Sequence, residues 1–290
     1  FIERLSEKST HTGELSGLST GLKSVDVVLD GLHRSDFIVI GGRPGMGKTV
    51  FMVQMAANIA RQNKGVAFLS LEMSAEMMTK KFLCNLGQLN PDVFNRLTDY
   101  TKEIELNLSD AIKQLKELSI FLYENPSTYL NKLLPLIRKV VEENNVRVVF
   151  IDYIQLVSVG NRRFNREAEI SIVCREIKKL AVELNITIIA GSQLSRQVEN
   201  RPGGSKRPQL SDLRESGSIE QDADKVIFLY RPEYYGIEVD ENNKPTKNRM
   251  ELLLSKNRNG PILDIPVSIA FHKSIVMDID YNQEDIYMRT

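Results

Sequence analysis

The feature that most constrains this chain is residues 42–49, Gly-Arg-Pro-Gly-Met-Gly-Lys-Thr, which match the phosphate-loop pattern G-x-x-x-x-G-K-[ST] at every fixed position. An apolar run, residues 37–41, precedes the loop, and a helix-compatible run, residues 50–60, follows it. A loop at a strand-to-helix junction points backbone N–H groups at the positive end of a helix dipole, which suits a polyphosphate. The sequence therefore predicts a nucleoside triphosphate site. The alternative, a glycine-rich turn that matches by chance, is disfavoured by the flanking strand and helix.

The side chains of the loop have separate expected roles. Lys48 can reach the β- and γ-phosphates, and the Thr49 hydroxyl can ligate Mg²⁺. The loop glycines lack the Cβ that would keep a phosphate away from the backbone. The residues expected to contact the nucleotide are therefore Gly42, Arg43, Pro44, Gly45, Met46, Gly47, Lys48 and Thr49.

Composition narrows the class of protein further. With 290 residues, 42% of them hydrophobic, the chain can form one large α/β domain or two small ones. The 38 basic side chains balance the 38 acidic ones, so only local basic patches can indicate a polyanionic partner. The sequence has no signal peptide and no apolar run of membrane-spanning length, and its two cysteines suit a reducing interior, so we expect a cytoplasmic protein. Three dispersed histidines suggest no zinc site.

Apolar runs alternate with helix-like segments along most of the chain, which predicts an α/β fold with a mainly parallel central sheet and helices on both faces. Ser74 is expected to cap one helix, and either Ser127 or Thr128 to cap another. Residues 167–184 carry apolar side chains along one helix face. The expected strands are residues 37–41, 65–72, 120–123, 146–151, 186–190, 226–230 and 250–255.

Polar side chains follow three of these strands. Asp152 lies at the carboxyl end of its strand, where α/β folds place their ligands, and can hold the Mg²⁺ that Thr49 touches. Glu72 and Gln193 end strands at the same edge, so either can act beside the γ-phosphate. The residues alone leave open a plainer interpretation of Glu72, a solvated glutamate at a strand end.

Together these pieces resemble the ATPase domain of DnaB-type replicative DNA helicases, a branch of the RecA-like motors. The sequences Asp-Leu-Arg-Glu-Ser-Gly and Lys-Asn-Arg-Asn-Gly-Pro are the most specific, because phosphate-loop proteins in general lack them. The resemblance covers roughly residues 12–261 and implies a RecA-like P-loop NTPase fold, with ATP and Mg²⁺ as cofactors. It also implies a homohexameric ring that hydrolyses ATP to move 5′-to-3′ along single-stranded DNA. The stretches that carry it are residues 42–49, 68–74, 149–156, 192–196, 211–224 and 255–261.

The resemblance assigns roles that the residues alone do not. It makes Glu72 the catalytic carboxylate, acting with Lys48, and Gln193 the glutamine that couples the nucleotide to DNA. Arg258, with Lys256 beside it, becomes an arginine finger on the ATP of the neighbouring subunit. Without the resemblance, the last two residues read as solvated cations at a strand end.

Two arginine-containing loops are candidates for binding the phosphates of single-stranded DNA. They are residues 159–166 and residues 196–217, and they follow consecutive core strands. In the resembling helicases such loops face the central channel, whereas the alternative for any one arginine is a solvated surface charge. Few aromatic side chains occur in either loop, so weak sequence preference is expected. The residues expected to contact DNA are Arg162, Arg163, Arg207, Arg214, Glu215 and Gly217.

The expected organisation is a linker, residues 1–12, followed by one RecA-like ATPase domain, residues 13–290. The chain begins at Phe1 and has no counterpart of the family's helical amino-terminal domain, so contacts with a primase and a helicase loader are expected of the full-length protein. Two alternatives remain. One is a RecA- or clock-type ATPase that shares the core. The other is a nucleotide-gated DNA-binding module without unwinding.

Overall fold

The computed structural model describes residues 15–95, 101–124, 126–161, 164–201, 205–213, 217–241 and 243–279. Every predicted strand is present within these residues. The strands are β1 (Phe37–Gly42), β2 (Gly65–Ser70), β3 (Ile120–Glu124), β4 (Val146–Asp152), β5 (Thr187–Gln193), β6 (Lys225–Tyr230), β7 (Arg249–Asn257), β8 (Asp264–Ala270) and β9 (Ile275–Asp278).

The helices alternate with the first six strands. None of the described helices is both long enough and apolar enough to span a membrane. The α-helices are α2 (Lys23–Leu29), α3 (Lys48–Ala60), α4 (Ala75–Gly87), α5 (Lys102–Glu117), α6 (Leu130–Asn144), α7 (Arg166–Glu183) and α8 (Gly217–Asp222). The short 3₁₀ helices are η1 (Pro91–Phe94), η3 (Ile154–Leu156), η4 (Arg196–Asn200), η5 (Leu210–Asp212), η6 (Pro232–Tyr235) and η7 (Phe271–Lys273).

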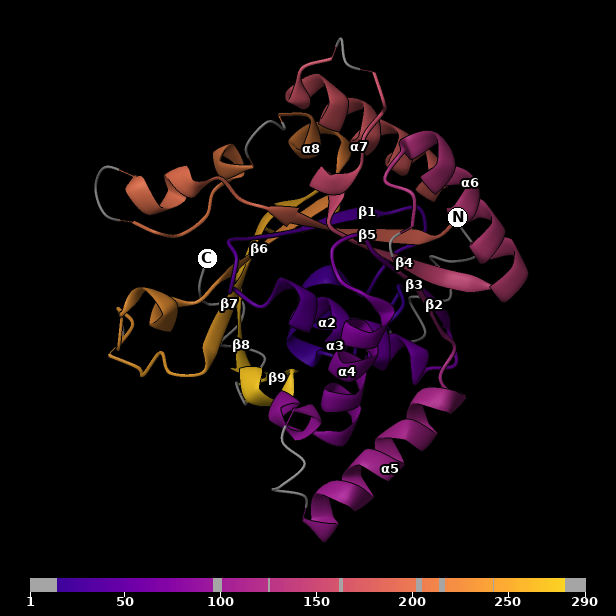
Figure 1. Cartoon of the computed structure of the whole chain (residues 1–290). Helices are drawn as coiled ribbons and strands as arrows, with labels where there is room; N and C mark the ends of the chain where they lie inside the picture. Colours follow the sequence, from indigo (N-terminus) through magenta and orange to yellow (C-terminus); the bar gives the residue numbers. More distant parts are fainter. Residues whose placement is uncertain are drawn as a thin grey trace, which may run out of the picture.

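The nine strands found in the described residues belong to one sheet, in the order β3-β2-β4-β5-β1-β6-β7-β8-β9 (Figure 1). The six strands from β3 to β6 in this order are parallel to one another. Strands β7, β8 and β9 extend the sheet as an antiparallel meander. The mainly parallel α/β sheet is therefore confirmed, and its carboxyl edge collects the ends of β1, β2, β4 and β5.

Helices cover both faces of the sheet, as predicted. In Figure 1, α2, α3 and α4 lie on one side of it, and α6, α7 and α8 lie on the other. The side chains of β1 alternate between the two layers: Ile38 and Ile40 pack with the core around α3, whereas Phe37 and Val39 pack with the core around α7. The sheet is thus buried on both faces, which explains why its central strands are continuous apolar runs.

The two predicted helix caps have different outcomes. The Ser74 hydroxyl accepts a hydrogen bond from the backbone N–H of Met77 and caps α4, as expected. The prediction that Ser127 or Thr128 caps the next helix is wrong, because Tyr129 is the residue before α6 and no side chain caps that helix. The physical reason is that Tyr129 pairs with Ser158 in an isolated parallel bridge, which keeps the chain extended and delays the start of the helix.

Candidate nucleotide-binding site

The phosphate loop leaves β1 and enters α3 through glycines with positive φ. Gly45 has a φ of 82° and Gly47 a φ of 96°, a region that other residues rarely adopt. A Cβ on Gly47 would lie 2.9 Å from both the Ile269 side chain and the Phe271 ring, so the loop is also tightly packed. No side chain caps α3. The amides of its first turn are thus presented by a tight, glycine-shaped loop, as an anion site requires.

Behind the loop, the last two side chains of the motif converge on one carboxylate. The Thr49 hydroxyl donates a 2.7 Å hydrogen bond to Asp152 Oδ2, and Lys48 Nζ lies 3.9 Å from Asp152 Oδ1. Asp152 is 3% exposed, and its Oδ1 has no hydrogen-bond partner among the described residues. A buried carboxylate oxygen beside a hydroxyl is the donor set that Mg²⁺ prefers, so these residues fit the ion.

Space for this arrangement comes from Gly191 in β5, which the sequence analysis missed. A Cβ at this position would lie 3.1 Å from both Asp152 Oδ1 and Lys48 Cε. Such contacts are tighter than side chains normally make, so glycine keeps room for the lysine and the carboxylate. The signal in the sequence was a glycine inside an otherwise apolar strand, which marks a close approach of other groups.

Lys48 is held on two sides. Its Nζ lies 4.7 Å from the centroid of the Tyr153 ring, in addition to its approach to Asp152. Burial lowers the pKa of Lys48, while the negative charges of Asp152 and Glu72 oppose that shift. Glu72 is exposed and lies two residues beyond the end of β2, at the same sheet edge. Its position fits the predicted catalytic carboxylate, and the role itself stays a prediction.

Gln193 is the last residue of β5 and lies opposite Gly42 in the sheet register. Its backbone is held by Gln155, whose Oε1 accepts from the Gln193 N–H at 3.1 Å and whose Nε2 donates to the Gln193 carbonyl at 3.1 Å. The same Nε2 also donates to Ser192 Oγ at 2.8 Å. Gln155 thus fixes the end of β5 beside the phosphate loop. It lies within residues 149–156 of the sequence, but its role needed the structure.

Not every residue of the loop turns its side chain to the nucleotide position. Arg43 Nε donates to Glu199 Oε1 at 2.9 Å, and its Nη1 donates to the Leu194 carbonyl at 3.0 Å. The Met46 side chain is 1% exposed and belongs to the core. These two residues therefore have only their backbone available for a phosphate, while Pro44 and Gly45 are exposed.

A planar cluster beside the loop was not predicted. The guanidinium of Arg231 lies 4.1 Å from the centroid of the Phe271 ring, and its Nη1 donates to the Gly45 carbonyl at 3.2 Å. Tyr234 is 51% exposed, and its ring would be 3.2 Å from a Cβ on Gly45. Flat aromatic and guanidinium faces next to a phosphate site suit a nucleoside base. The signal in the sequence was Arg-Pro-Glu-Tyr-Tyr directly after an apolar strand.

Arg258 and Lys256 lie at the opposite edge of the sheet. Strand β7 is antiparallel to β6, and Asn257 pairs with Lys225, the first residue of β6. The Arg258 backbone N–H donates to the Asp224 carbonyl at 3.0 Å, and its Nη1 donates to Asp224 Oδ1 at 3.1 Å. Because β6 has six residues, these cations lie about 20 Å from the carboxyl edge, at roughly 3.3 Å per residue. Neither can reach the phosphate loop of its own chain.

Lys256 is held beside Arg258. Its ammonium group donates to the carbonyl of Glu220, and to that of Gln221 at 3.3 Å, so it binds the end of α8. Burial lowers the pKa of Lys256, and the neighbouring charge of Arg258 lowers it further. The two cations thus lie side by side, with Lys256 bound to the end of α8 and Arg258 bound to Asp224, two residues after that helix.

Among the predicted DNA contacts, Arg162, Arg163, Arg214 and Glu215 lie outside the described residues, and Gly217 begins α8. Arg207 is described, and its side chain forms ion pairs with Glu251 of β7 and Asp264 of β8. Its guanidinium also lies 5.3 Å from the centroid of the Tyr230 ring. Arg207 therefore anchors the second basic loop to the sheet, and its contact with DNA stays a prediction.

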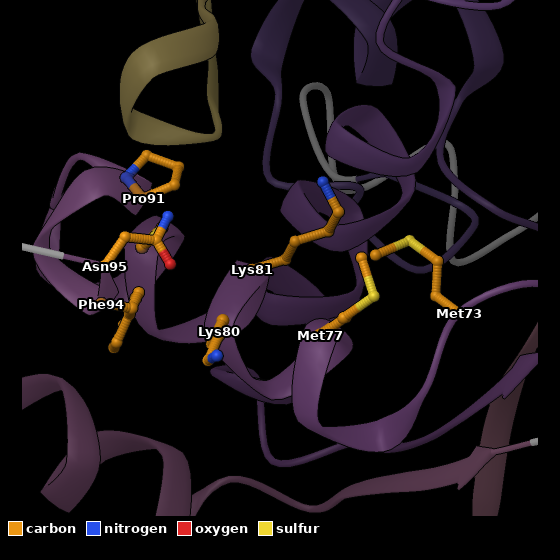
Figure 2. Close-up of a pocket in the computed structure, with 8 residues that line it drawn as sticks. Met73, Met77, Lys80, Lys81, Pro91, Phe94 and Asn95 are labelled. Carbon is orange, nitrogen blue, oxygen red and sulfur yellow. The ribbon is translucent and has the colours of Figure 1, made fainter.

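A separate hollow of about 260 Å³ lies between α4 and η1. Figure 2 shows methionine, lysine and aromatic side chains around it. Burial raises the pKa of Cys84 in this lining to about 11, so the thiol stays protonated. The hollow shares no residue with the phosphate loop and is not part of the nucleotide site. Its lining is Met73, Met77, Lys80, Lys81, Cys84, Pro91, Phe94 and Asn95.

Comparison with known proteins gives one consistent family. The model of the DnaB-like helicase C-terminal domain matches residues 17–277. The replicative DNA helicase DnaB of Geobacillus stearothermophilus is 40% identical over 263 residues, which cover 90% of this chain and 56% of that protein. The replicative DNA helicase DnaC of Bacillus subtilis is 39% identical over 274 residues, which cover 94% of this chain and 58% of that protein. The chain thus spans a little more than half the length of these curated relatives.

Solved structures agree with the sequence comparison. One solved ATPase domain superposes with a TM-score of 0.88 at 33% identity, covering 96% of this chain and 97% of that one. A DnaB-like replicative helicase, described together with its interactions with primase, superposes with a TM-score of 0.87 at 32% identity. It is matched over 96% of this chain and 66% of its own.

Proposed function

Since this chain belongs to the family of DnaB-like helicase C-terminal domains, we propose that it is the ATP-hydrolysing motor of a replicative DNA helicase. The observation that carries the proposal is the division of the catalytic groups between two edges of one sheet. Lys48 and Asp152 lie at the carboxyl edge, whereas Arg258 lies at the other. The site is therefore incomplete in one chain and is completed by a neighbour.

At the carboxyl edge the chain supplies an anion site and a proton acceptor. The glycine-shaped loop and the start of α3 bind the phosphates, with Lys48 compensating their charge. Thr49 and Asp152 would hold Mg²⁺, which supplies further neutralisation of charge on the phosphates. Glu72 accepts the proton of the attacking water, and its exposed position at the strand end leaves room for that water.

The distant arginine explains why the motor would be a ring. A guanidinium stabilises the transferring phosphoryl group only where it can approach it closely. Because Arg258 cannot reach its own loop, each active site takes its arginine from the adjacent subunit. A head-to-tail contact of this kind, repeated by rotation, closes into a ring. Six subunits are the number that the resemblance implies.

Single-stranded DNA is the proposed track, with 5′-to-3′ movement taken over from the resemblance. The two basic loops follow β4 and β5, so both start from the edge that holds the nucleotide. Contacts with a primase and a helicase loader belong to the same proposal for the full-length protein, supported by the relative described with primase. The cytoplasmic location expected from the sequence is part of it too.

The direct test combines turnover with imaging. Purified protein should hydrolyse ATP faster with single-stranded DNA than without it, and negative-stain images with an ATP analogue should show six-fold rings. Lys48→Ala is the matched inactive control. Removing the Lys48 side chain should leave the fold intact, because its ammonium group lies 3.9 Å from Asp152 and 4.7 Å from the centroid of the Tyr153 ring and makes no shorter contact with either. Turnover that persists in that variant, or a wild-type protein that stays monomeric and ignores DNA, would contradict the proposal.

A further inference from the structure

One side chain bridges the phosphate loop and the start of the second basic loop. Arg43 reaches across from the end of β1 and contacts two points beyond the end of β5. These are the Leu194 carbonyl at 3.0 Å and the Glu199 carboxylate at 2.9 Å. The Arg43 side chain is 9% exposed, so the guanidinium is largely shielded from solvent, whereas the Glu199 carboxylate is partly open to it.

The sheet register makes this bridge short. Gly42 and Gln193 are directly opposite each other in β1 and β5, and the Leu194 N–H donates to the Gly42 carbonyl at 3.3 Å. Arg43 is the next residue of the phosphate loop, so its long side chain runs alongside the chain that leaves β5. That chain enters η4, which contains Glu199.

Glu199 in turn holds the second basic loop at a later point. Its backbone carbonyl accepts a hydrogen bond from the ammonium group of Lys206. The next residue, Arg207, is tied by ion pairs to Glu251 and Asp264. The loop is therefore anchored to the sheet at Arg207, near its middle, and to the phosphate loop through Glu199, near its start.

We propose that Arg43 and Glu199 are positioning residues that transmit the state of the bound nucleotide to the second basic loop. The proposal rests on the proposed function, in which that loop binds single-stranded DNA. A nucleotide that pulls on the phosphate-loop backbone displaces the Arg43 guanidinium, whose planar geometry carries the displacement to Leu194 and Glu199 together. Glu199 then moves η4 and the loop that Lys206 fastens to it.

The ion pair between Arg43 and Glu199 is weak enough to break and reform as the nucleotide changes. The Glu199 side chain is 38% exposed, and a half-exposed ion pair contributes modestly to stability because solvent screens it. Replacing Glu199 should therefore change the communication between the sites more than it changes the fold. Such communication is a coupling free energy, so nucleotide and DNA must change each other's affinity by the same factor.

The experiment measures that factor. The dissociation constant of a fluorescent single-stranded oligonucleotide is determined with and without a non-hydrolysable ATP analogue, for wild type, Glu199→Ala and Glu199→Gln. The ratio of the two constants cancels any uniform gain in DNA affinity from losing a negative charge. Glu183→Ala is the matched control, because Glu183 pairs with Arg138 at 2.8 Å at the end of α7, which leads into the start of β5 and is remote from the phosphate loop.

We expect the ratio to fall roughly threefold or more in both Glu199 variants, within the usual range of coupling between sites. Basal ATP turnover and melting temperature should stay close to wild type, and Glu183→Ala should keep the full ratio. In an Arg43→Gln background, Glu199→Ala should have no additional effect, because the pair is already broken.

The possible failures are distinguishable. A wild-type protein whose DNA affinity does not respond to nucleotide would overturn both the proposed function and this inference. A wild-type protein that responds, with Glu199 variants that respond equally, would overturn the inference alone. Additive effects of the Arg43 and Glu199 substitutions on the ratio would also overturn the inference alone.

Discussion

The hydroxyl of Thr49 donates a 2.7 Å hydrogen bond to the buried carboxylate of Asp152, although the two residues are 103 positions apart in the chain. This bond joins the first turn of α3 to the end of β4. It leaves the other oxygen of Asp152 buried and without a hydrogen-bond partner among the described residues. A buried carboxylate oxygen without a hydrogen bond is costly, and the Lys48 ammonium approaches this one only to 3.9 Å, so this edge is where a metal cation is expected.

The role of Glu72 predicts a separation between binding and turnover. Glu72→Gln removes the proton acceptor but keeps the size of the side chain, so ATP should still bind while hydrolysis falls by about 10²–10⁴-fold. A fluorescent ATP analogue measures binding, and phosphate release measures turnover. If both are lost together, Glu72 supports the nucleotide or its metal ion and the proton acceptor lies elsewhere.

The opposite-edge position of Arg258 predicts that two inactive variants restore each other. Arg258→Ala and Lys48→Ala should each lose ATP turnover, by roughly 10²–10³-fold for loss of one charge-stabilising group. In mixed rings, some intact Lys48 sites face an intact Arg258 from the other variant, so partial activity should return. Turnover across a series of mixing ratios is the measurement. Co-assembled mixtures that stay inactive at every ratio would show that Arg258 does not act between subunits.

The close packing of Gly191 against Asp152 and Lys48 predicts that a side chain at this position weakens the binding of Mg²⁺. The Cβ of Gly191→Ala would crowd Asp152 Oδ1 and Lys48 Cε at 3.1 Å, so the Mg²⁺ concentration that supports half-maximal turnover should rise about tenfold or more. Stability should fall by only about 1–3 kcal/mol, as for other added methyl groups in a packed site. Gly236→Ala is the control for lost stability alone: its φ of 74° strains any side chain, but a Cβ there meets nothing within 4 Å, so the Mg²⁺ requirement should not change. An unchanged Mg²⁺ requirement would show that the space between Gly191, Asp152 and Lys48 accommodates a methyl group without disturbing the metal site.

The two basic side chains of the second loop should behave differently. Arg214→Ala should flatten the dependence of DNA affinity on salt by about one phosphate contact, if that residue binds a phosphate. Arg207→Ala leaves Glu251 largely buried without its partner, so it should lower the free energy of unfolding by about 1–2 kcal/mol. Salt-dependent oligonucleotide binding and urea unfolding separate the two effects. An Arg207 variant with unchanged stability but a flatter salt slope would assign Arg207 to DNA instead of to the sheet.

Residues that are close together along the chain were sufficient to predict the phosphate loop, the places of the strands and the α/β class, although the strand expected to end at Glu72 ends at Ser70. Each of these depends on residues that are close together along the chain: the glycine spacing of residues 42–49, an apolar run ending at Asp152, and the one-sided apolar pattern of α7. Local backbone preference and hydrophobic periodicity are sufficient for such features, because neighbouring residues alone decide them.

The contacts between distant residues depend on how the strands pair in the folded sheet. The register between β1 and β5 brings Arg43 to Glu199, and the register between β6 and β7 places Arg258 away from Lys48. The same holds for Gly191 and for the pairing of Tyr129 with Ser158, which shifted the start of α6. Pairing between strands is fixed by packing across the whole sheet, and a shift of one residue in the register would displace the loops and residues at the strand ends from these partners.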